Sequence, residues 1–123
     1  KIVEFAGAKI DLFHIKASRD IVRYEATRIS LGYVDAPEKK PELLTINYEV
    51  GDGFVIVSDG LTDQIGGNDG NLRAYGYRRL EALLKSVASN SAADIAETMK
   101  ADLKTWQGPE IRRDDVSALI FRL

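Results

Sequence analysis

A buried strand that runs directly into an acidic turn is the feature that most constrains this sequence. The run 54–57 (Phe-Val-Ile-Val) is apolar and rich in β-branched residues, and turn glycines precede it, which predicts a central strand. Ser58, Asp59 and Gly60 follow at its end. A carboxylate in this position is held on a rigid scaffold, as in many metal and acid-base sites, but Asp-Gly after a strand is also the commonest hairpin signal. The turn alone leaves both interpretations open.

The composition excludes several classes of protein. The chain has 123 residues, 45% of them hydrophobic, which is enough to bury the core of one domain. Lys and Arg number 17 against 19 Asp and Glu, without a basic block, so binding to nucleic acid or to a membrane surface has no electrostatic support. Cysteine is absent and His14 is the single histidine, so a metal would need carboxylate ligands. Oxygen ligands favour Mg²⁺, Mn²⁺ or Ca²⁺.

The ends of the chain and its compartment are matters of expectation. Without cysteine, a signal segment or a membrane-spanning run, we expect a cytoplasmic location. The chain enters a strand pattern at Ile2 with no initiator methionine or linker before it. Because domain boundaries normally fall in polar, flexible chain, we expect part of the fold to lie upstream.

Strand patterns dominate the first half of the chain. Alternating apolar residues predict strands over 2–6, 10–16, 20–26 and 43–50, besides 54–57. We expect 2–6 and 10–16 to form a hairpin that 20–26 continues as an antiparallel meander, and 43–50 to form a second hairpin with 54–57 through a tight turn at 50–53. Residues 35–42 and the Gly-rich run 66–71 are predicted to be loops, the latter a mobile one.

Two helices and a final strand complete the pattern. Helical spacing begins near Tyr75, and a second helix follows Ser91, where Asp94 three residues later resembles a capping box. The apolar positions are Leu80, Leu83, Leu84 and Val87 in the first helix and Ile95, Met99, Leu103 and Trp106 in the second. Gly108-Pro109 ends the second helix, and 116–123 is a strand. Strands followed by two helices and a returning strand predict an α+β domain whose sheet is covered on one face by the helix pair.

Acidic residues stand at two predicted strand ends. Asp59 follows 54–57, and the pair Asp114-Asp115 precedes 116–123. If the two strands are neighbours, the carboxylates converge, and a divalent cation would relieve their repulsion. Patterning alone favours the alternative, that they are solvated turn aspartates. His14 and Trp106 are interpreted as structural residues.

The acidic motifs resemble those of the metal-dependent protein phosphatases, the PPM or type-2C family, and more narrowly its bacterial SpoIIE-like branch. The resemblance rests on the run 54–64 (Phe-Val-Ile-Val-Ser-Asp-Gly-Leu-Thr-Asp-Gln) and on 113–117 (Arg-Asp-Asp-Val-Ser), and residues 3–12 and 29–32 also resemble the SpoIIE-like branch. Residues 63–67 (Asp-Gln-Ile-Gly-Gly) and 106–108 (Trp-Gln-Gly) further resemble a subgroup found at the cytoplasmic end of sensor proteins. The likeness spans nearly the whole chain in the same order.

The resemblance implies both a fold and a site. The fold would be an antiparallel β-sandwich flanked by helices, of which residues 1–123 would be the C-terminal part. Asp59 and Asp114 match the family's metal ligands, and Asp115 occupies a neighbouring position with a supporting role. The metals would be two Mn²⁺ or Mg²⁺ ions, and the reaction the hydrolysis of a phosphoserine or phosphothreonine by a water between them. The family's upstream Gly-Asp motif is absent, so this chain alone would not form a complete, active site.

The resemblance also implies partners. The substrate would be a phosphorylated regulatory protein resembling an anti-sigma antagonist, in a partner-switching pathway. A sensor domain would lie upstream, and homodimerisation and anchoring of the parent protein at the inner membrane stay open. The alternative is a non-catalytic signalling or dimerisation module that keeps the phosphatase fold.

Overall fold

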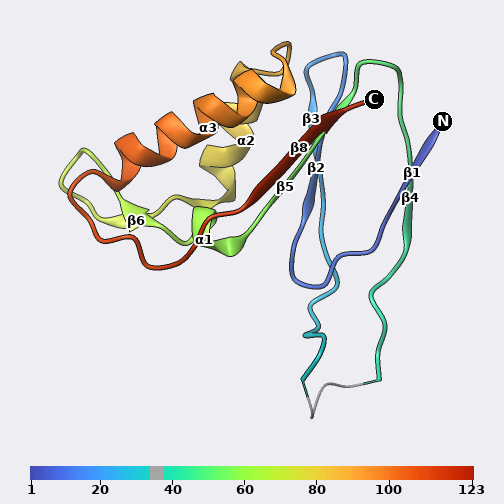
Figure 1. Cartoon of the computed structure of the whole chain (residues 1–123), viewed down its shortest axis with the longest axis horizontal. Coiled ribbons are helices and arrows are strands. Elements are labelled where there is room, and N and C mark those ends of the chain that lie inside the picture. Colours follow the sequence, from blue (N-terminus) through green and yellow to red (C-terminus); the bar gives the residue numbers. More distant parts are fainter. Residues whose placement is uncertain (34–37) are drawn as a thin grey trace.

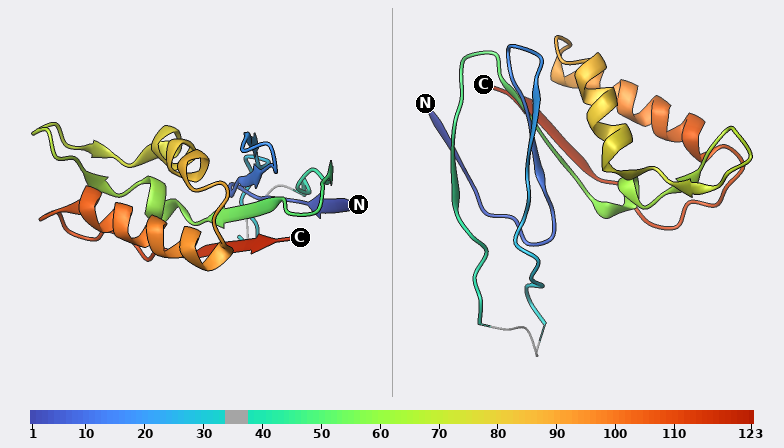
Figure 2. Two further views of the ribbon diagram at one scale, coloured as in Figure 1. Left: turned by 90° about the horizontal axis from the view of Figure 1, so that it is seen from above. Right: turned by 180° about the vertical axis from the view of Figure 1, so that it is seen from behind.

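The computed structural model describes residues 1–33 and 38–123, which form three layers (Figures 1 and 2). The middle layer is an antiparallel four-stranded sheet whose strands, in spatial order, are β3 (Ile21–Tyr24), β2 (Leu12–Ile15), β5 (Gly53–Val57) and β8 (Ala118–Arg122). Helices α2 (Gly76–Ser86) and α3 (Ala92–Gln107) cover one face. A two-stranded sheet of β1 (Ile2–Phe5) and β4 (Leu44–Asn47) packs against the other. The predicted α+β class and its helix-covered sheet are confirmed.

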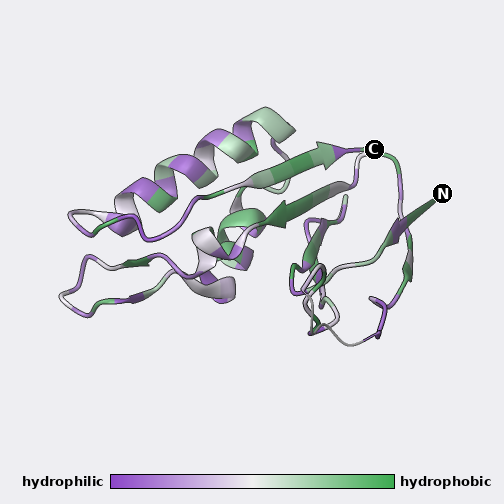
Figure 3. Ribbon diagram, turned by 60° about the horizontal axis from the view of Figure 1, so that its bottom comes forward, coloured by the Kyte–Doolittle hydropathy of each residue, from purple (hydrophilic) through white to green (hydrophobic). Residues whose placement is uncertain are grey.

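Strand alternation divides the apolar core into two parts. Phe13 and Val55, paired across β2 and β5, pack toward the helices. Leu12 and Phe54 belong to a second cluster with Ile46 of β4. Successive side chains of a strand point to opposite faces, so a strand covered on both sides reads as a continuous apolar run. The continuous hydrophobic colour of β5 and the mixed colouring of α3 in Figure 3 show this difference between a central strand and a surface helix.

Both predicted hairpins between neighbouring strands are wrong. β1 pairs with β4 rather than with β2, and β4 does not pair with β5, which lies between β2 and β8. The connections at 6–11 and 48–52 instead carry the chain from one sheet to the other. The reason is burial: every residue of β2 is buried, so β2 needs a neighbour on each edge and cover on both faces. The β2–β3 pairing of the predicted meander is confirmed.

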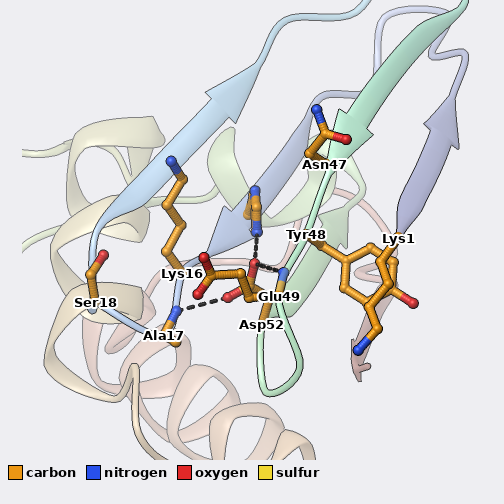
Figure 4. Close-up of a pocket in the computed structure, with 9 residues that line it drawn as sticks. Lys1, Lys16, Ala17, Ser18, Asn47, Tyr48, Glu49 and Asp52 are labelled. Carbon is orange, nitrogen blue, oxygen red and sulfur yellow. Dashed lines mark hydrogen bonds and ion pairs between the residues drawn. The ribbon is translucent and has the colours of Figure 1, made fainter.

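The corner between β4 and β5 is organised by the buried carboxylate of Asp52, which is 3% exposed (Figure 4). It accepts hydrogen bonds from the backbone N–H of Ala17 at 2.8 Å and of Glu49 at 3.0 Å, and from His14 Nε2 at 2.7 Å. Since the carboxylate accepts, His14 must carry its proton on Nε2. Its buried Nδ1 has no partner among the described residues. Asp52 therefore ties the β2–β3 turn to the corner.

We expect Asp52→Asn to lower the free energy of unfolding by about 2 kcal/mol, because it weakens three hydrogen bonds to a buried charge. Burial alone would raise the pKa of the Asp52 carboxyl, but the hydrogen bonds from Glu49, His14 and Ala17 outweigh it and hold the pKa below its ordinary value of 3.8. The stabilisation is thus complete above that value and is lost as the pH falls through the lower, folded-state pKa.

Denaturant unfolding of the wild type and the variant at a series of pH values measures this effect. The difference between the two proteins should be constant near neutral pH and shrink in strong acid. Glu49→Gln, which neutralises an exposed carboxylate at the same corner, is the matched control and should change little. A difference that grows on acidification would contradict the assignment.

The helices agree with their predicted positions. α2 begins one residue after Tyr75, and Ser91 caps α3 by accepting a hydrogen bond from the Asp94 N–H. Gly108 follows α3 with a positive φ of 53°, which glycine adopts without strain. Residues 35–37 of the loop predicted at 35–42 lie outside the described residues, and residues 38–42 contain no helix or strand. The predicted loop at 66–71 is the tip of a short hairpin of β6 (Ile65–Gly66) and β7 (Arg73–Ala74).

Candidate metal centre

Asp59 is presented to solvent by a short helical turn. The turn after β5 is the helix α1 (Asp59–Thr62), with Ser58 as its N-cap, and is not the hairpin that Asp-Gly also signals. Gly60, Leu61 and Thr62 are buried, whereas Asp59 and Asp63 are exposed. Leu61 belongs to the core beneath the helices. One side of the turn thus anchors it, while the other side presents the Asp59 carboxylate.

The segment that carries Asp114 runs alongside this turn. β5 and β8 are neighbours as the sequence hypothesis required, and their pairing continues beyond Val57 and Ala118. Ser58 N donates to Ser117 O at 2.9 Å, and Ser117 N donates to Ser58 Oγ at 2.9 Å. The two segments are therefore fastened together directly beside Asp59.

Gly60 allows the two backbones to approach closely. A Cβ at this position would lie 2.1 Å from the carbonyl oxygen of Asp115, closer than side-chain carbons approach a backbone atom. A residue with a side chain would therefore push the 114–115 segment away. Gly60 thus sets the separation between the two acidic segments, which are the turn that carries Asp59 and the segment that carries Asp114 and Asp115.

The three predicted site residues lie on these adjoining segments, and all three are exposed. The Asp114 carboxylate accepts a 2.7 Å hydrogen bond from the backbone N–H of Asp115. Asp115 thus contacts Asp114 through its main chain, and its carbonyl oxygen faces Gly60. That Asp59 and Asp114 bind metal, and that Asp115 supports them, stay predictions.

The carboxylates of Asp59 and Asp114 have the chemistry that a hard divalent cation prefers, but two ligands do not complete its coordination sphere. Two exposed carboxylates on adjoining segments are the oxygen ligands that Mg²⁺ and Mn²⁺ prefer. Residues 1–33 and 38–123 contain no group of three or more His, Asp or Glu side chains able to hold a metal. Asp59 and Asp114 would therefore supply part of a coordination sphere.

Beyond the site, a polar network joins the two helices. The Asp102 carboxylate of α3 accepts from Tyr75 Oη at 2.5 Å and from Arg79 of α2 at 2.8 and 3.1 Å. Burial alone would raise the pKa of Asp102, but the hydrogen bonds from Arg79 and Tyr75 lower it. Burial, followed by the hydrogen bond to Asp102, raises the pKa of Tyr75. This network holds the helix pair together as a structural unit.

Sequence reasoning missed two residues near the site, Ser58 and Gln64. Ser58 uses its backbone and its hydroxyl to hold the second acidic segment. Gln64 is 1% exposed, and its side chain reaches across to the chain before Asp114. Both residues belong to the motif 54–64 that carries the family resemblance, so the motif pointed to them. The hydrophobic pattern did not, because it gives no reason for a neutral polar side chain such as Gln64 to be buried.

Comparisons with known proteins agree with the fold and the motifs. The family model of stage II sporulation protein E (SpoIIE) matches residues 3–123. The SiaA PP2C domain of Pseudomonas aeruginosa superimposes with a TM-score of 0.80 at 30% identity, over 99% of this chain and 46% of that one. None of the curated protein sequences matches the chain.

Solved structures of Bacillus subtilis SpoIIE share the fold at lower identity. Its PP2C phosphatase domain with a fragment of the regulatory domain gives a TM-score of 0.77 at 16% identity, over 99% of this chain and 34% of that one. The Mn-presoaked phosphatase domain gives 0.66 at 14% identity, over 100% of this chain and 56% of that one. The chain thus spans less than two thirds of each of these structures. Since the family model covers almost all of its length, the chain is a SpoIIE-like member of the PPM phosphatase family.

Proposed function

We propose that the protein containing this chain is a metal-dependent serine/threonine phosphatase that acts on a phosphorylated regulatory protein. The observation that carries the proposal is the fastening of the Asp59 turn to the Asp114 segment by Ser58, Ser117 and Gly60. These contacts hold two carboxylates on adjoining segments where β5 ends and β8 begins. The chain that carries them matches the SpoIIE family over 3–123.

The chain offers neither a cysteine nor an accessible histidine as a nucleophile, which supports hydrolysis by water. The sequence has no cysteine, and its one histidine, His14, is 1% exposed and bonded to Asp52 at the opposite end of β5. Asp59 and Asp114 are exposed, where a phosphorylated side chain of another protein can reach them. Two divalent cations held by such carboxylates would lower the pKa of a bound water and neutralise phosphoryl charge.

The family resemblance supports three further proposals. The substrate resembles an anti-sigma antagonist, a sensor domain lies upstream, and the protein acts in the cytoplasm. Within the described part of the chain, no helix has the length and apolar character needed to cross a membrane.

Removal of metal from the full-length protein tests the proposal. We expect chelation by EDTA to reduce phosphate release from a phosphoserine peptide by at least about hundredfold, and added Mn²⁺ or Mg²⁺ to restore it, because water is a poor nucleophile without a cation. A phosphotyrosine peptide of the same sequence is the substrate control. Release that survives chelation would contradict metal dependence, and no release with any metal would favour the non-catalytic module.

A further inference from the structure

Gln64 joins the two acidic segments at the end away from the sheet. Its amide Nε2 donates to the backbone oxygens of Ile65 and Ile111, each at 3.0 Å. Because both partners are carbonyl groups, the amide orientation is settled: the NH₂ faces them. The Oε1 atom is buried and has no partner among the described residues. A buried amide with an unsatisfied oxygen costs stability, so it calls for a role beyond packing.

Trp106 holds Gln64 in place from the end of α3. Its indole Nε1 donates to Gln64 O at 3.1 Å, and its own carbonyl oxygen accepts from Gly67 N at 3.0 Å. A Cβ on Gly66 would lie 1.9 Å from that same oxygen. The motifs 63–67 and 106–108, which are far apart in sequence, thus contact each other directly. We call Gln64, Gly66, Gly67 and Trp106 the Gln64 clamp.

The segment 111–117 has few other supports. It has no helix or strand, and all of its residues except Val116 are exposed, with Ile111 82% exposed. Hydrogen bonds fasten its two ends, from Ser58 to Ser117 at the sheet and from Gln64 to Ile111 at the clamp. Arg112 adds a third tether to Gln107 Oε1, at 2.6 and 2.9 Å. Val116 packs against the core, and Ser58 Oγ donates to Asp115 O at 3.4 Å. The part of the segment from Ile111 to Asp114 has less buried surface, so its position depends on the tethers at Ile111 and Arg112.

The contacts follow the antiparallel order of the sheet. After the pair Val57 and Ala118 come Ser58 with Ser117, Gly60 with Asp115, and Gln64 with Ile111. Asp59 and Asp114 both lie inside this ladder, between its first and last contacts. Loss of the last contact would leave Asp114 on a segment fastened at the sheet end and through Arg112.

We propose that Gln64 is a positioning residue that holds the Asp114 segment against the Asp59 turn and so sets the geometry in which the two carboxylates bind metal. The inference rests on the proposed function. Gln64 itself is buried, and of its two hydrogen-bond acceptors only the Ile111 carbonyl lies on the segment that carries Asp114. Removing the tether should change stability little, because the carbonyl of Ile111, in an exposed part of the chain, can bond to water instead.

The variant Gln64→Met in the full-length protein tests this role, since it keeps the unbranched shape and removes the donor. We expect Mn²⁺ binding, measured by electron paramagnetic resonance without substrate, to weaken about tenfold, as for other partners that orient metal ligands. Amide hydrogen exchange over 111–117 should become faster. Gln107→Met, at a half-buried position, removes the acceptor of the Arg112 tether. It should also weaken Mn²⁺ binding and speed exchange over 111–117. This second variant serves if Gln64→Met does not fold.

The matched control is Tyr75→Phe, which removes one hydrogen bond, to Asp102, at the same junction of hairpin and helices without touching 111–117. It should leave both measurements unchanged. Mn²⁺ affinity lost in Asp59→Asn but kept in a folded Gln64→Met, or kept in Gln107→Met where Gln64→Met does not fold, would overturn the positioning role alone. A wild-type protein with no Mn²⁺ affinity would overturn the proposed function, and this inference with it.

Discussion

Asp59→Asn and Asp114→Asn are each expected to reduce Mn²⁺-dependent phosphate release by the full-length protein at least about hundredfold. An amide has nearly the shape of a carboxylate but no negative charge, so it binds a hard cation far more weakly. Both side chains are exposed, so neither change should disturb folding. Steady-state rates over a Mn²⁺ titration separate weaker metal binding from a slower reaction at saturating metal.

Asp63→Asn is the matched control for these variants. Asp63 is also exposed and follows the other end of α1, where its backbone N–H donates to the carbonyl oxygens of Asp59 and Leu61. Its replacement should leave the rate within about a factor of two, as expected for a surface change away from the site. If Asp63→Asn were as damaging as Asp59→Asn, the assignment of Asp59 would lose its support. Normal rates in both Asp59→Asn and Asp114→Asn would reject the metal centre.

Gly60→Ala is expected to reduce activity by about hundredfold without removing any metal ligand, a loss typical of a 1 Å misplacement in a catalytic site. The added Cβ would meet the Asp115 carbonyl oxygen at 2.1 Å and its carbon at 3.0 Å, and both atoms are backbone. The acidic segments must therefore separate. Denaturant unfolding should show a loss of about 1–3 kcal/mol, as for other overpacked sites.

Gly53→Ala, at the end of β5 opposite the Gly60 turn, is the control for this prediction. There the nearest atom to an added Cβ is 3.4 Å away and belongs to the side chain of Arg122, with Ile15 Cβ at 3.5 Å, so neither contact is a backbone clash. We expect a small change in stability and a normal rate. Equal activities of Gly60→Ala and the wild type would show that the separation of the two segments does not matter to the reaction.

The local elements could be predicted from sequence because their signals are local. Hydrophobic spacing and the Ser91 cap predicted α3, and the apolar run 54–57 predicted β5 as a central strand. Strand pairing was predicted wrongly where it depended on distant parts of the chain. The turns at 7–9 and 50–53 have hairpin composition, yet each connects two sheets, because the burial of β2 demands neighbours from elsewhere.

The sequence by itself determined the α+β class, the helix pair, the central strand and the acidic turn that follows it, since each depends on residues close together in the chain. Only the tertiary structure decided which segment lies beside that turn and what holds it there. The pairing of β5 with β8, the close approach at Gly60 and the buried link from Gln64 to Ile111 join residues about fifty positions or more apart. Such contacts depend on the path of the whole chain, because hydrogen bonding and packing act through space and leave no periodic signal in the sequence.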